Sequence, residues 1–354
     1  MASAQKKKKQ HKHSLKKRIL IWVAWAIGIL IALAIAVYVA FQVSPWPSSL
    51  LVRFAFNQDA QQRLDALQKH APANVSSILD RSYRKHDKDA LLDVYFPSPI
   101  EGSDTRLPTI FWVHGGGWIS GDKKYAAPYF QILANKGYTV VSINYSLAPG
   151  KTYPTPVEQT SEALEYVQKH AGEFHIDTNQ FIFAGDSAGS QIIAQVATLA
   201  TNADYAKTVE INPNIKTEQI RGMVLNCGAY DLSIVNTNGN DEGAQLLRTF
   251  LWAYSGQKNF SHDSHIAPAS VAEYVTKDFP PAFITAGNND PLLPQSQLMV
   301  EKLKSLGVSV DALFFPSDYQ PALPHEYQFN LDNTAGQQAL DQISTFIDQH
   351  TEHQ

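Results

Sequence analysis

The feature that most constrains the fold is a repeated alternation between short apolar runs and longer segments of helical periodicity, which begins near residue 78. The apolar runs are DALLDVYF, LPTIFWVHG, YTVVSINYS, NQFIFAGD, IRGMVLNCG, PAFITAGN and VDALFFPS. Helical spacing of apolar residues marks 157–171, 188–200, 294–307 and 331–350. Strands that alternate with helices form a mostly parallel sheet with helices on both faces. We therefore predict a doubly wound α/β domain over residues 78–354.

The charge of the chain is unevenly distributed. Eight of its 29 Lys and Arg residues lie in residues 1–18, which contain none of the 33 Asp and Glu residues, leaving 21 basic against 33 acidic residues in the remainder. Phosphate binding requires cations clustered on the folded surface. The acidic body therefore argues against nucleic acid as a partner, and residues 1–18 are predicted to be a basic tail.

An apolar segment follows this tail, because Ile19–Val43 contains no charged side chain over 25 residues. As a helix it would be about 38 Å long, enough to cross a hydrocarbon core of about 30 Å. The alternatives are a buried core helix and a signal peptide cleaved after VYVA at 37–40, although signal peptides usually have only about 7–15 apolar residues. We predict an uncleaved single-pass anchor in the cell membrane. The Lys-rich end then predicts a cytoplasmic N-terminus and an extracytoplasmic body.

Residues 44–77 begin with a Pro- and Ser-rich stretch and continue as an amphipathic segment. They are predicted to form a linker and a helix, which is a candidate for a cap or lid. The only cysteine, Cys227, cannot form an internal disulfide, and its apolar surroundings indicate a buried strand residue. No cluster of metal ligands is apparent, so neither a metal nor another cofactor is predicted, and the oligomeric state stays open.

Open α/β sheets bind ligands beyond the carboxyl ends of their strands, so the residues after each apolar run matter most. One such run ends in GDSAG at 185–189, immediately before a predicted helix. In G-x-S-x-G the glycines permit a sharp turn that exposes the serine, and a serine beside a base becomes a nucleophile. The short pattern also arises by chance in plain turns. Its position between strand and helix favours Ser187 as a nucleophile.

A second strand end carries HGGGW at 114–118. Backbone N–H groups of glycines are unobstructed donors, and the oxyanion of a tetrahedral intermediate needs such donors. A merely flexible glycine loop is the competing interpretation. The position after a strand favours an oxyanion hole made by Gly116, Gly117 and Ala188, with Gly115 as an alternate.

A serine nucleophile also needs a base and an acid that orients it, and in this architecture they follow the serine in the order acid, histidine. Five histidines follow Ser187, but only His325 lies between the last predicted strand and the last predicted helix. Asp290 follows PAFITAGN and precedes Pro291. We predict His325 as the base and Asp290 as the acid, with Asp231 as the alternative acid.

Together these motifs resemble the hormone-sensitive-lipase-like branch of the α/β-hydrolase esterases. The resemblance covers about residues 78–349 and includes Tyr145-Ser-Leu-Ala-Pro, followed by Tyr153-Pro154. The family's usual Tyr-Arg-Leu-Ala-Pro-Glu reads YSLAPG here. Members hydrolyse short to medium acyl esters without a cofactor, through an acyl-enzyme, and the resemblance implies the same activity for this chain.

Aromatic residues near the strand ends are candidates for substrate contacts, although each is equally compatible with the core. We predict contacts from Trp118, Tyr145 and Tyr319, with further candidates at Tyr230, Tyr327 and 246–254. The polar loop around His325 favours small soluble esters or acylated envelope sugars. The alternative functions are a serine peptidase or a deacetylase of envelope carbohydrate on the same fold. A catalytically silent binding protein is less favoured, because such proteins typically lack the serine, histidine or oxyanion glycines.

Overall fold

A computed structural model describes the backbone of residues 2–235, 239 and 242–352, and the side chains of these residues except 2–14, 242 and 262. The side chains of most of the predicted basic tail therefore lie outside the described residues. The chain divides into two compact units, Met1–Ser48 and Ser49–Gln354. Each is described by itself.

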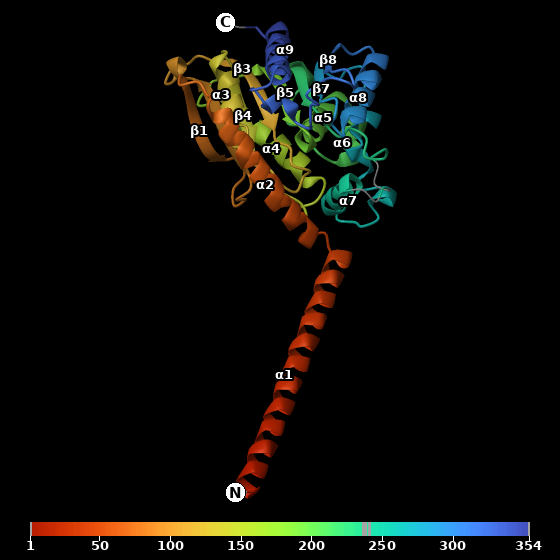
Figure 1. Ribbon diagram of the computed structural model, residues 1–354. Coiled ribbons are helices and arrows are strands. Elements are labelled where there is room, and N and C mark those ends of the chain that lie inside the picture. Colours follow the sequence, from red (N-terminus) through yellow and green to blue (C-terminus); the bar gives the residue numbers. More distant parts are fainter. Residues whose placement is uncertain (1, 236–238, 240–241, 353–354) are drawn as a thin grey trace. The chain divides into compact units, whose positions relative to one another are not determined.

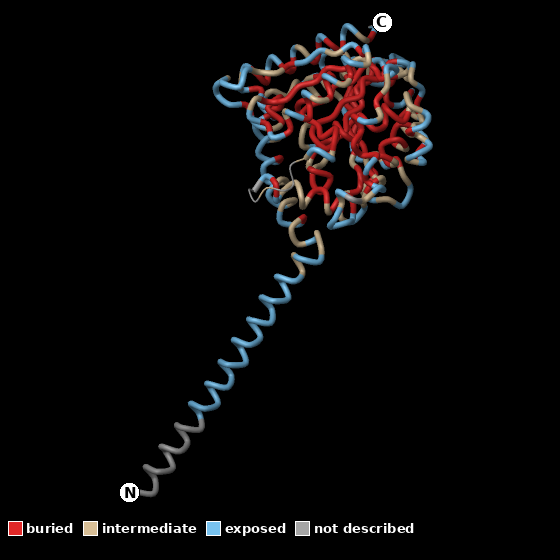
Figure 2. The backbone as a smooth tube through the Cα atoms, turned by 90° about the vertical axis from the view of Figure 1, so that its right-hand side faces the viewer, coloured by how far each residue is buried: buried red, intermediate tan, exposed pale blue. Residues whose placement is uncertain are grey.

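The first unit consists mainly of one long helix, α1 (Ala2–Val43). Its segment Leu15–Val43 is long and apolar enough to cross a membrane, and none of its most apolar window is buried within the protein. In Figure 2 the described part of this helix is coloured almost entirely as exposed, with Ala40 and Phe41 intermediate. Exposing so much apolar surface to water is unfavourable. A membrane span meets this test of length and composition, and a signal sequence near the N-terminus can also pass it.

The second unit contains one eight-stranded sheet in the order β1-β2-β4-β3-β5-β6-β7-β8 (Figure 1). The strands are β1 (Val75–Ser82), β2 (Leu91–Pro97), β3 (Leu107–Val113), β4 (Thr139–Ile143), β5 (Ile176–Asp186), β6 (Ile220–Asn226), β7 (Ala282–Ala286) and β8 (Val310–Phe314). Strand β2 pairs antiparallel with β1 and β4, whereas all pairs from β4 to β8 are parallel. The predicted α/β fold with a mostly parallel sheet is confirmed.

Helices follow most of the strands, as the alternating pattern predicts. They are α3 (Ala127–Asn135), α4 (Thr155–Lys169), α5 (Ala188–Thr201), α6 (Ala203–Val209), α7 (Glu242–Ser255), α8 (Leu293–Ser305) and α9 (Thr334–His350). One further helix, α2 (Trp46–Gln68), precedes the sheet, and its residues from Ser49 onward belong to the second unit.

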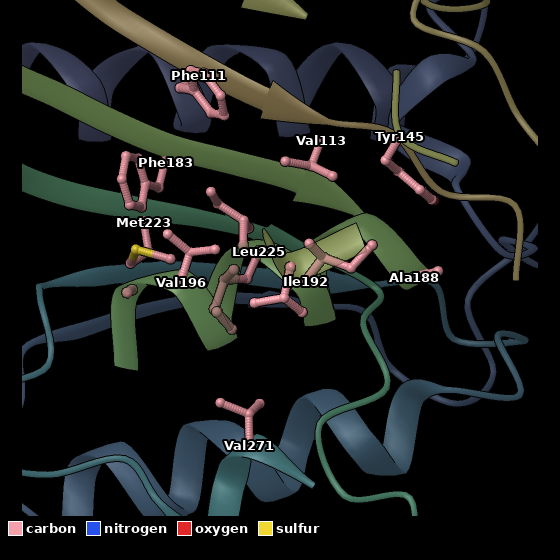
Figure 3. Close-up of a cluster of buried hydrophobic side chains, with 14 of the residues drawn as sticks. Phe111, Val113, Tyr145, Phe183, Ala188, Ile192, Val196, Met223, Leu225 and Val271 are labelled. Atoms are coloured by element: carbon pink, nitrogen blue, oxygen red, sulfur yellow. The ribbon is translucent and has the colours of Figure 1, made fainter. Parts of the chain in front are cut away.

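The core lies on both faces of the sheet. In β3, Phe111 and Val113 belong to an apolar cluster that includes α4, α5 and α8, whereas Ile110 and Trp112 belong to a second cluster with α3 and α9. This alternation follows from the two-residue period of a strand. Figure 3 shows part of the first cluster, where side chains of β3, β5 and β6 gather beside α5. A strand buried on both faces reads as a continuous apolar run, which explains why the sequence revealed β3 to β7.

The N-terminal boundary of the sheet differs from the expectation. Strand β1 begins at Val75, before the domain boundary expected at residue 78, whereas α2 lies within 44–77, where a linker and a helix were predicted. The residues of β1 are half-buried or exposed, because β1 is an edge strand with one neighbour. Its sequence VSSILDRS therefore lacks the apolar run by which the buried strands were recognised.

Candidate active site

Ser187 lies in the turn between β5 and α5, with φ 51° and ψ −121°. The neighbouring glycines are required by close backbone packing. A Cβ at Gly189 would lie 2.0 Å from the carbonyl oxygen of Val113, and one at Gly185 would lie 2.7 Å from the backbone of Gly189. The turn is held by a hydrogen bond that the N–H of Ser187 donates to the carbonyl of Asn226, at 2.9 Å. The motif thus places the serine hydroxyl at the carboxyl end of the sheet.

The three predicted triad residues lie together. The Oγ atom of Ser187 is 2.9 Å from Nε2 of His325, and Nδ1 of His325 is 2.9 Å from Oδ2 of Asp290. The other carboxylate oxygen of Asp290 accepts a hydrogen bond from the N–H of Leu292, at 2.7 Å. The side chain of Asp290 is fully buried, whereas that of His325 is 32% exposed. Each residue follows a different strand, so the sheet sets their spacing.

The environment of His325 has opposing effects on its pKa. Burial lowers the pKa of His325, while Cys227 and Asp290 raise it by more, so the net pKa lies well above its ordinary value. Burial also raises the pKa of the Cys227 thiol to about 11, which keeps the sulfur uncharged at neutral pH. The charge that stabilises protonated His325 at neutral pH is therefore that of Asp290.

The glycine loop after β3 is arranged around a buried carboxyl group. The N–H of Gly115 donates to Oδ2 of Asp186 at 2.7 Å, so it is already occupied and does not suit the alternate oxyanion role. Within the described part of the chain, the N–H groups of Gly116, Gly117 and Ala188 have no hydrogen-bond acceptor. Both Gly116 and Gly117 have positive φ, at 108° and 60°. These three donors remain available for a ligand.

Ser187 and His325 line a cavity of about 840 Å³. One side is formed by the strand-end loops, including the 114–118 segment, and another by α2. Side chains of α7 complete an apolar part of the wall; they are Leu246, Leu247, Phe250 and Leu251. A cavity of this size is in the range of small-molecule sites.

Only one of the three predicted substrate contacts lines this cavity. Trp118 does so, and its ring stacks on Tyr254 with centroids 4.5 Å apart. Tyr145 instead lies behind the glycine loop, where its hydroxyl donates to the carbonyl of His114 at 3.0 Å. Tyr319 packs against Phe315, with ring centroids 4.7 Å apart. The predictions for Tyr145 and Tyr319 are corrected, because a tyrosine near a strand end can support a loop from behind as readily as face the substrate.

The further aromatic candidates divide in the same way. Tyr327 and four residues of 246–254 line the cavity, whereas Tyr230 does not. The alternative acid Asp231 is buried but accepts hydrogen bonds from the N–H and hydroxyl of Ser233. It is thus part of a local turn after β6.

The model of the BD-FAE family matches residues 92–303, more than half of the chain. The chain belongs to the BD-FAE family. It is 27% identical over 259 residues to an esterase of Gibberella moniliformis, covering 72% of this chain and 78% of the relative. It is 28% identical over 222 residues to an acetyl esterase of Salmonella paratyphi B, covering 61% and 64%.

Among solved structures, esterase B from Lactobacillus rhamnosis superposes with a TM-score of 0.71 at 21% identity, covering 84% of this chain and 96% of that one. This likeness shows the fold. The family match and the sequence relatives identify the protein as a serine carboxylic ester hydrolase of the hormone-sensitive-lipase-like branch of α/β-hydrolases. The predicted family and enzyme class are confirmed.

Sequence reasoning missed a buried ionic network beside the triad. Asp186 accepts hydrogen bonds from Trp112 Nε1 and from the N–H of Gly115, both at 2.7 Å, and it shares a hydrogen bond with Glu326. Glu326 follows His325 directly and forms an ion pair with Arg63 of α2. The network thus connects the glycine loop, the histidine loop and α2.

The pKa values of the two carboxyl groups in this network are shifted in opposite directions. Burial raises the pKa of Asp186 well above its ordinary value, and the charge of Glu326 raises it further. Burial also acts to raise the pKa of Glu326, but Arg63 and His325 offset this, so that pKa is lowered. The proton of this pair is therefore favoured on Asp186, and the negative charge is favoured on Glu326 beside Arg63.

Helix α2 docks on the body through one face. Arg53 donates to the carbonyls of Ile119 and Ala148, the latter at 2.9 Å, and Phe56 packs edge-on against Phe250, with ring centroids 5.7 Å apart. The residues that face the body recur at a spacing of three and four; they are Arg53, Phe56, Ala60, Arg63 and Leu67. This spacing was the available signal that α2 forms a wall of the site.

One group of side chains near the triad could in principle hold a metal ion. Donor atoms of Cys227, Asp290 and His325 all lie within 4.8 Å of one another. A metal ion there would compete for the His325 and Asp290 atoms that form the hydrogen-bonded chain to Ser187. It would also need the thiolate of a cysteine whose pKa burial raises to about 11. The group suits a triad better than a metal centre.

Proposed function

We propose that the protein is a membrane-anchored serine esterase in which Ser187 is the nucleophile, His325 the general base and Asp290 the residue that orients the base. The observation that carries this assignment is the hydrogen-bonded chain from Ser187 through His325 to Asp290 at the edge of the cavity. The burial of Asp290 supports it, because a desolvated carboxylate holds the imidazole in one tautomer and stabilises its protonated form.

In the acylation step, Oγ of Ser187 attacks the carbonyl carbon of the ester while Nε2 of His325 takes the hydroxyl proton. The N–H groups of Gly116, Gly117 and Ala188 then donate to the oxyanion of the tetrahedral intermediate. The intermediate collapses as the bond from carbon to the alkoxy oxygen breaks. His325 returns the proton to that oxygen, the alcohol leaves, and the acyl group stays on Ser187.

In the deacylation step, a water molecule takes the place of the alcohol. His325 removes one proton from the water as its oxygen attacks the acyl carbon, and the same donors hold the oxyanion. Collapse breaks the bond to Oγ of Ser187, which regains its proton from His325. The products are a carboxylic acid and the free enzyme, so no cofactor is needed.

The walls of the cavity support short to medium acyl esters as substrates. Trp118, Phe56 and Phe250 are large apolar side chains that limit its width, and Leu246 and Leu251 extend the apolar surface. The acetyl esterase among the relatives is consistent with the short end of this range. Acylated envelope sugars are included as substrates, since only the acyl group needs the apolar wall.

The anchoring proposal rests on the apolar segment Leu15–Val43 and on the basic residues before it. Positive charges near the end of a span favour the cytoplasmic side. The enzyme is therefore a single-pass protein of the cell membrane with its N-terminus in the cytoplasm and its catalytic unit outside. Labelling a reporter in the tail and another in the body of intact cells tests this orientation, and external labelling of the tail would contradict it.

The enzymatic assignment is tested with the detergent-solubilised full chain and a series of nitrophenyl esters from acetyl to dodecanoyl. We expect a maximum of kcat/KM at short or medium chains and a loss of about 10⁴-fold or more in Ser187→Ala. Ser190→Ala is the matched control, because Ser190 is also buried but donates to the carbonyl of Asn226. Turnover that survives in Ser187→Ala would refute the assignment. A peptide substrate separates the esterase from a peptidase. A kcat/KM for an acetylated sugar far above that for nitrophenyl acetate would favour a dedicated carbohydrate deacetylase over a general esterase.

A further inference from the structure

The exposed large apolar residues outside α1 are concentrated at the start of α2. Outside α1, large apolar side chains in the described part of the chain are exposed at six positions, Trp46, Leu50, Leu51, Phe54, Leu79 and Ile234. Four of the six fall within nine residues. Leu51 and Phe54 are 63% and 66% exposed. Single exposed apolar residues are ordinary, but such a group marks an interaction surface.

The exposed face of α2 changes in character along the helix. In its first turns this face carries Leu50, Leu51 and Phe54, whereas farther on it carries glutamines and an aspartate; these are Gln58, Gln61, Gln62 and Asp65. Apolar exposure is thus confined to the end of α2 that follows the proposed anchor. A helix that meets an apolar phase along its whole length would not show this change.

The apolar face is fixed in its outward position. Arg53 is the only charged residue between Val43 and Asp59, and its guanidinium donates inward to the carbonyls of Ile119 and Ala148. With Arg53 and Phe56 held against the body, Leu50, Leu51 and Phe54 cannot turn inward without breaking those contacts. The outward side of these first turns carries no charge that would oppose contact with lipid.

Chain connectivity brings this face near the bilayer. Leu50 follows Val43, the last residue of α1, by seven residues, which span at most about 25 Å even when fully extended. We propose that Leu50, Leu51 and Phe54 insert into the interfacial region of the lipid bilayer, so that α2, which also forms a wall of the cavity, is held at the membrane surface. This inference rests on the proposed anchoring by α1.

The proposal is tested with the full chain, verified by intact mass and reconstituted in phosphatidylcholine vesicles. A nitroxide is attached at Leu51→Cys or Phe54→Cys, with Gln58→Cys and Gln61→Cys as controls on the same face. Electron paramagnetic resonance then compares collisions with oxygen, which concentrates in lipid, and with a water-soluble nickel chelate. Native Cys227 does not interfere, because it is buried.

We expect the ratio of oxygen to nickel accessibility at residues 51 and 54 to exceed that at residue 61 several-fold. Equal, water-like ratios at all four positions would overturn the proposal. A second copy of the chain, instead of lipid, would shield the label at residue 51 from both reagents. It would also cause spin–spin broadening that disappears when the labelled protein is diluted with unlabelled protein. Each variant should also hydrolyse nitrophenyl acetate at the parent's rate, because residues 51, 54, 58 and 61 do not line the cavity. If the parent itself does not hydrolyse nitrophenyl acetate, the enzymatic assignment is contradicted, whereas the membrane contact is still decided by the accessibility ratios.

Discussion

Two sides of the cavity are built in different ways. On one side Ser187, Asp290 and His325 stand on short loops after β5, β7 and β8, and backbone packing around glycines holds the Ser187 turn in place. On the other side α2 is attached by a few side chains on one face, while its opposite face is exposed.

This difference teaches which features of the enzyme can vary independently. Groups that move protons must be held to within a fraction of an ångström, which a buried sheet achieves and a helix docked by side chains does not. We therefore expect changes on the strand-end side to alter kcat. Changes on the α2 side should alter stability, substrate preference and membrane contact.

After Ser187→Ala, the largest expected effect is at Asp290. Asp290→Asn keeps the shape of the side chain but removes the charge that holds His325 in its working tautomer, so kcat should fall by about 10³–10⁴-fold with little change in KM. Asp231→Asn is the matched control, since Asp231 is also a buried acid after a strand but binds Ser233. Steady-state kinetics of both variants check this. An equal loss at Asp231 would mean that the acid has been misassigned.

A smaller loss is expected at the glycine loop. In Gly117→Ala the new methyl group would lie 2.6 Å from the ring of Phe250, so the loop or the ring must shift, and the φ of +60° strains the loop in either case. Both effects should weaken the oxyanion donors. We expect kcat to fall by about 10²-fold. Gly307→Ala controls for backbone strain, because Gly307 also has positive φ but faces open space; it should cost about 1 kcal/mol of stability and no activity. Unchanged kcat in Gly117→Ala would show that the N–H groups of this loop do not stabilise the oxyanion.

The pH dependence of kcat/KM should also be set by residues on the strand-end side of the cavity. His325 must be neutral to accept a proton, and its pKa is raised well above 6.5, so activity should rise about tenfold per pH unit up to that pKa. Residual activity of Asp290→Asn should show this acid limb at lower pH, because the charge that raises the pKa is gone. Phe56→Leu, on α2, should leave the limb in place. A limb centred below pH 6.5 in the parent would contradict the electrostatic account.

The smallest effect on activity is expected at Arg63. Arg63→Ala removes the cation beside Glu326, which is buried and charged, and should destabilise the fold by about 1–2 kcal/mol, a discounted value because Arg63 is 43% exposed. We expect kcat to fall only a few-fold, with part of the stability restored by Arg63→Lys. Lys207→Ala, in an exposed pair with Asp204, is the neutral control. A loss of kcat as large as that of Asp290→Asn would show that α2 belongs to the catalytic machinery. It would contradict the distinction between the two sides of the cavity.

Buried strands were the part of the fold most readily predicted from the sequence. Strands β2 to β8 stand out as apolar runs because most are covered on both faces, whereas β1 at the sheet edge has polar, half-exposed residues and was missed. The same distinction holds in the site. The strand-end order of Ser187, Asp290 and His325 could be read along the chain, but the positions of Tyr145 and Tyr319 could not, because a tyrosine side chain reaches equally far toward a ligand or behind a loop.

The sequence by itself determined the α/β architecture, the esterase motifs and the length of the N-terminal apolar helix, since these depend on periodicity and on residues close together in the chain. Only the tertiary structure decided that Arg63, Asp186 and Glu326 form one network and that α2 is a wall of the cavity. Arg63 and Glu326 are 263 positions apart. A local pattern cannot encode such a pairing, because it arises only when the sheet edge and α2 are brought together by folding.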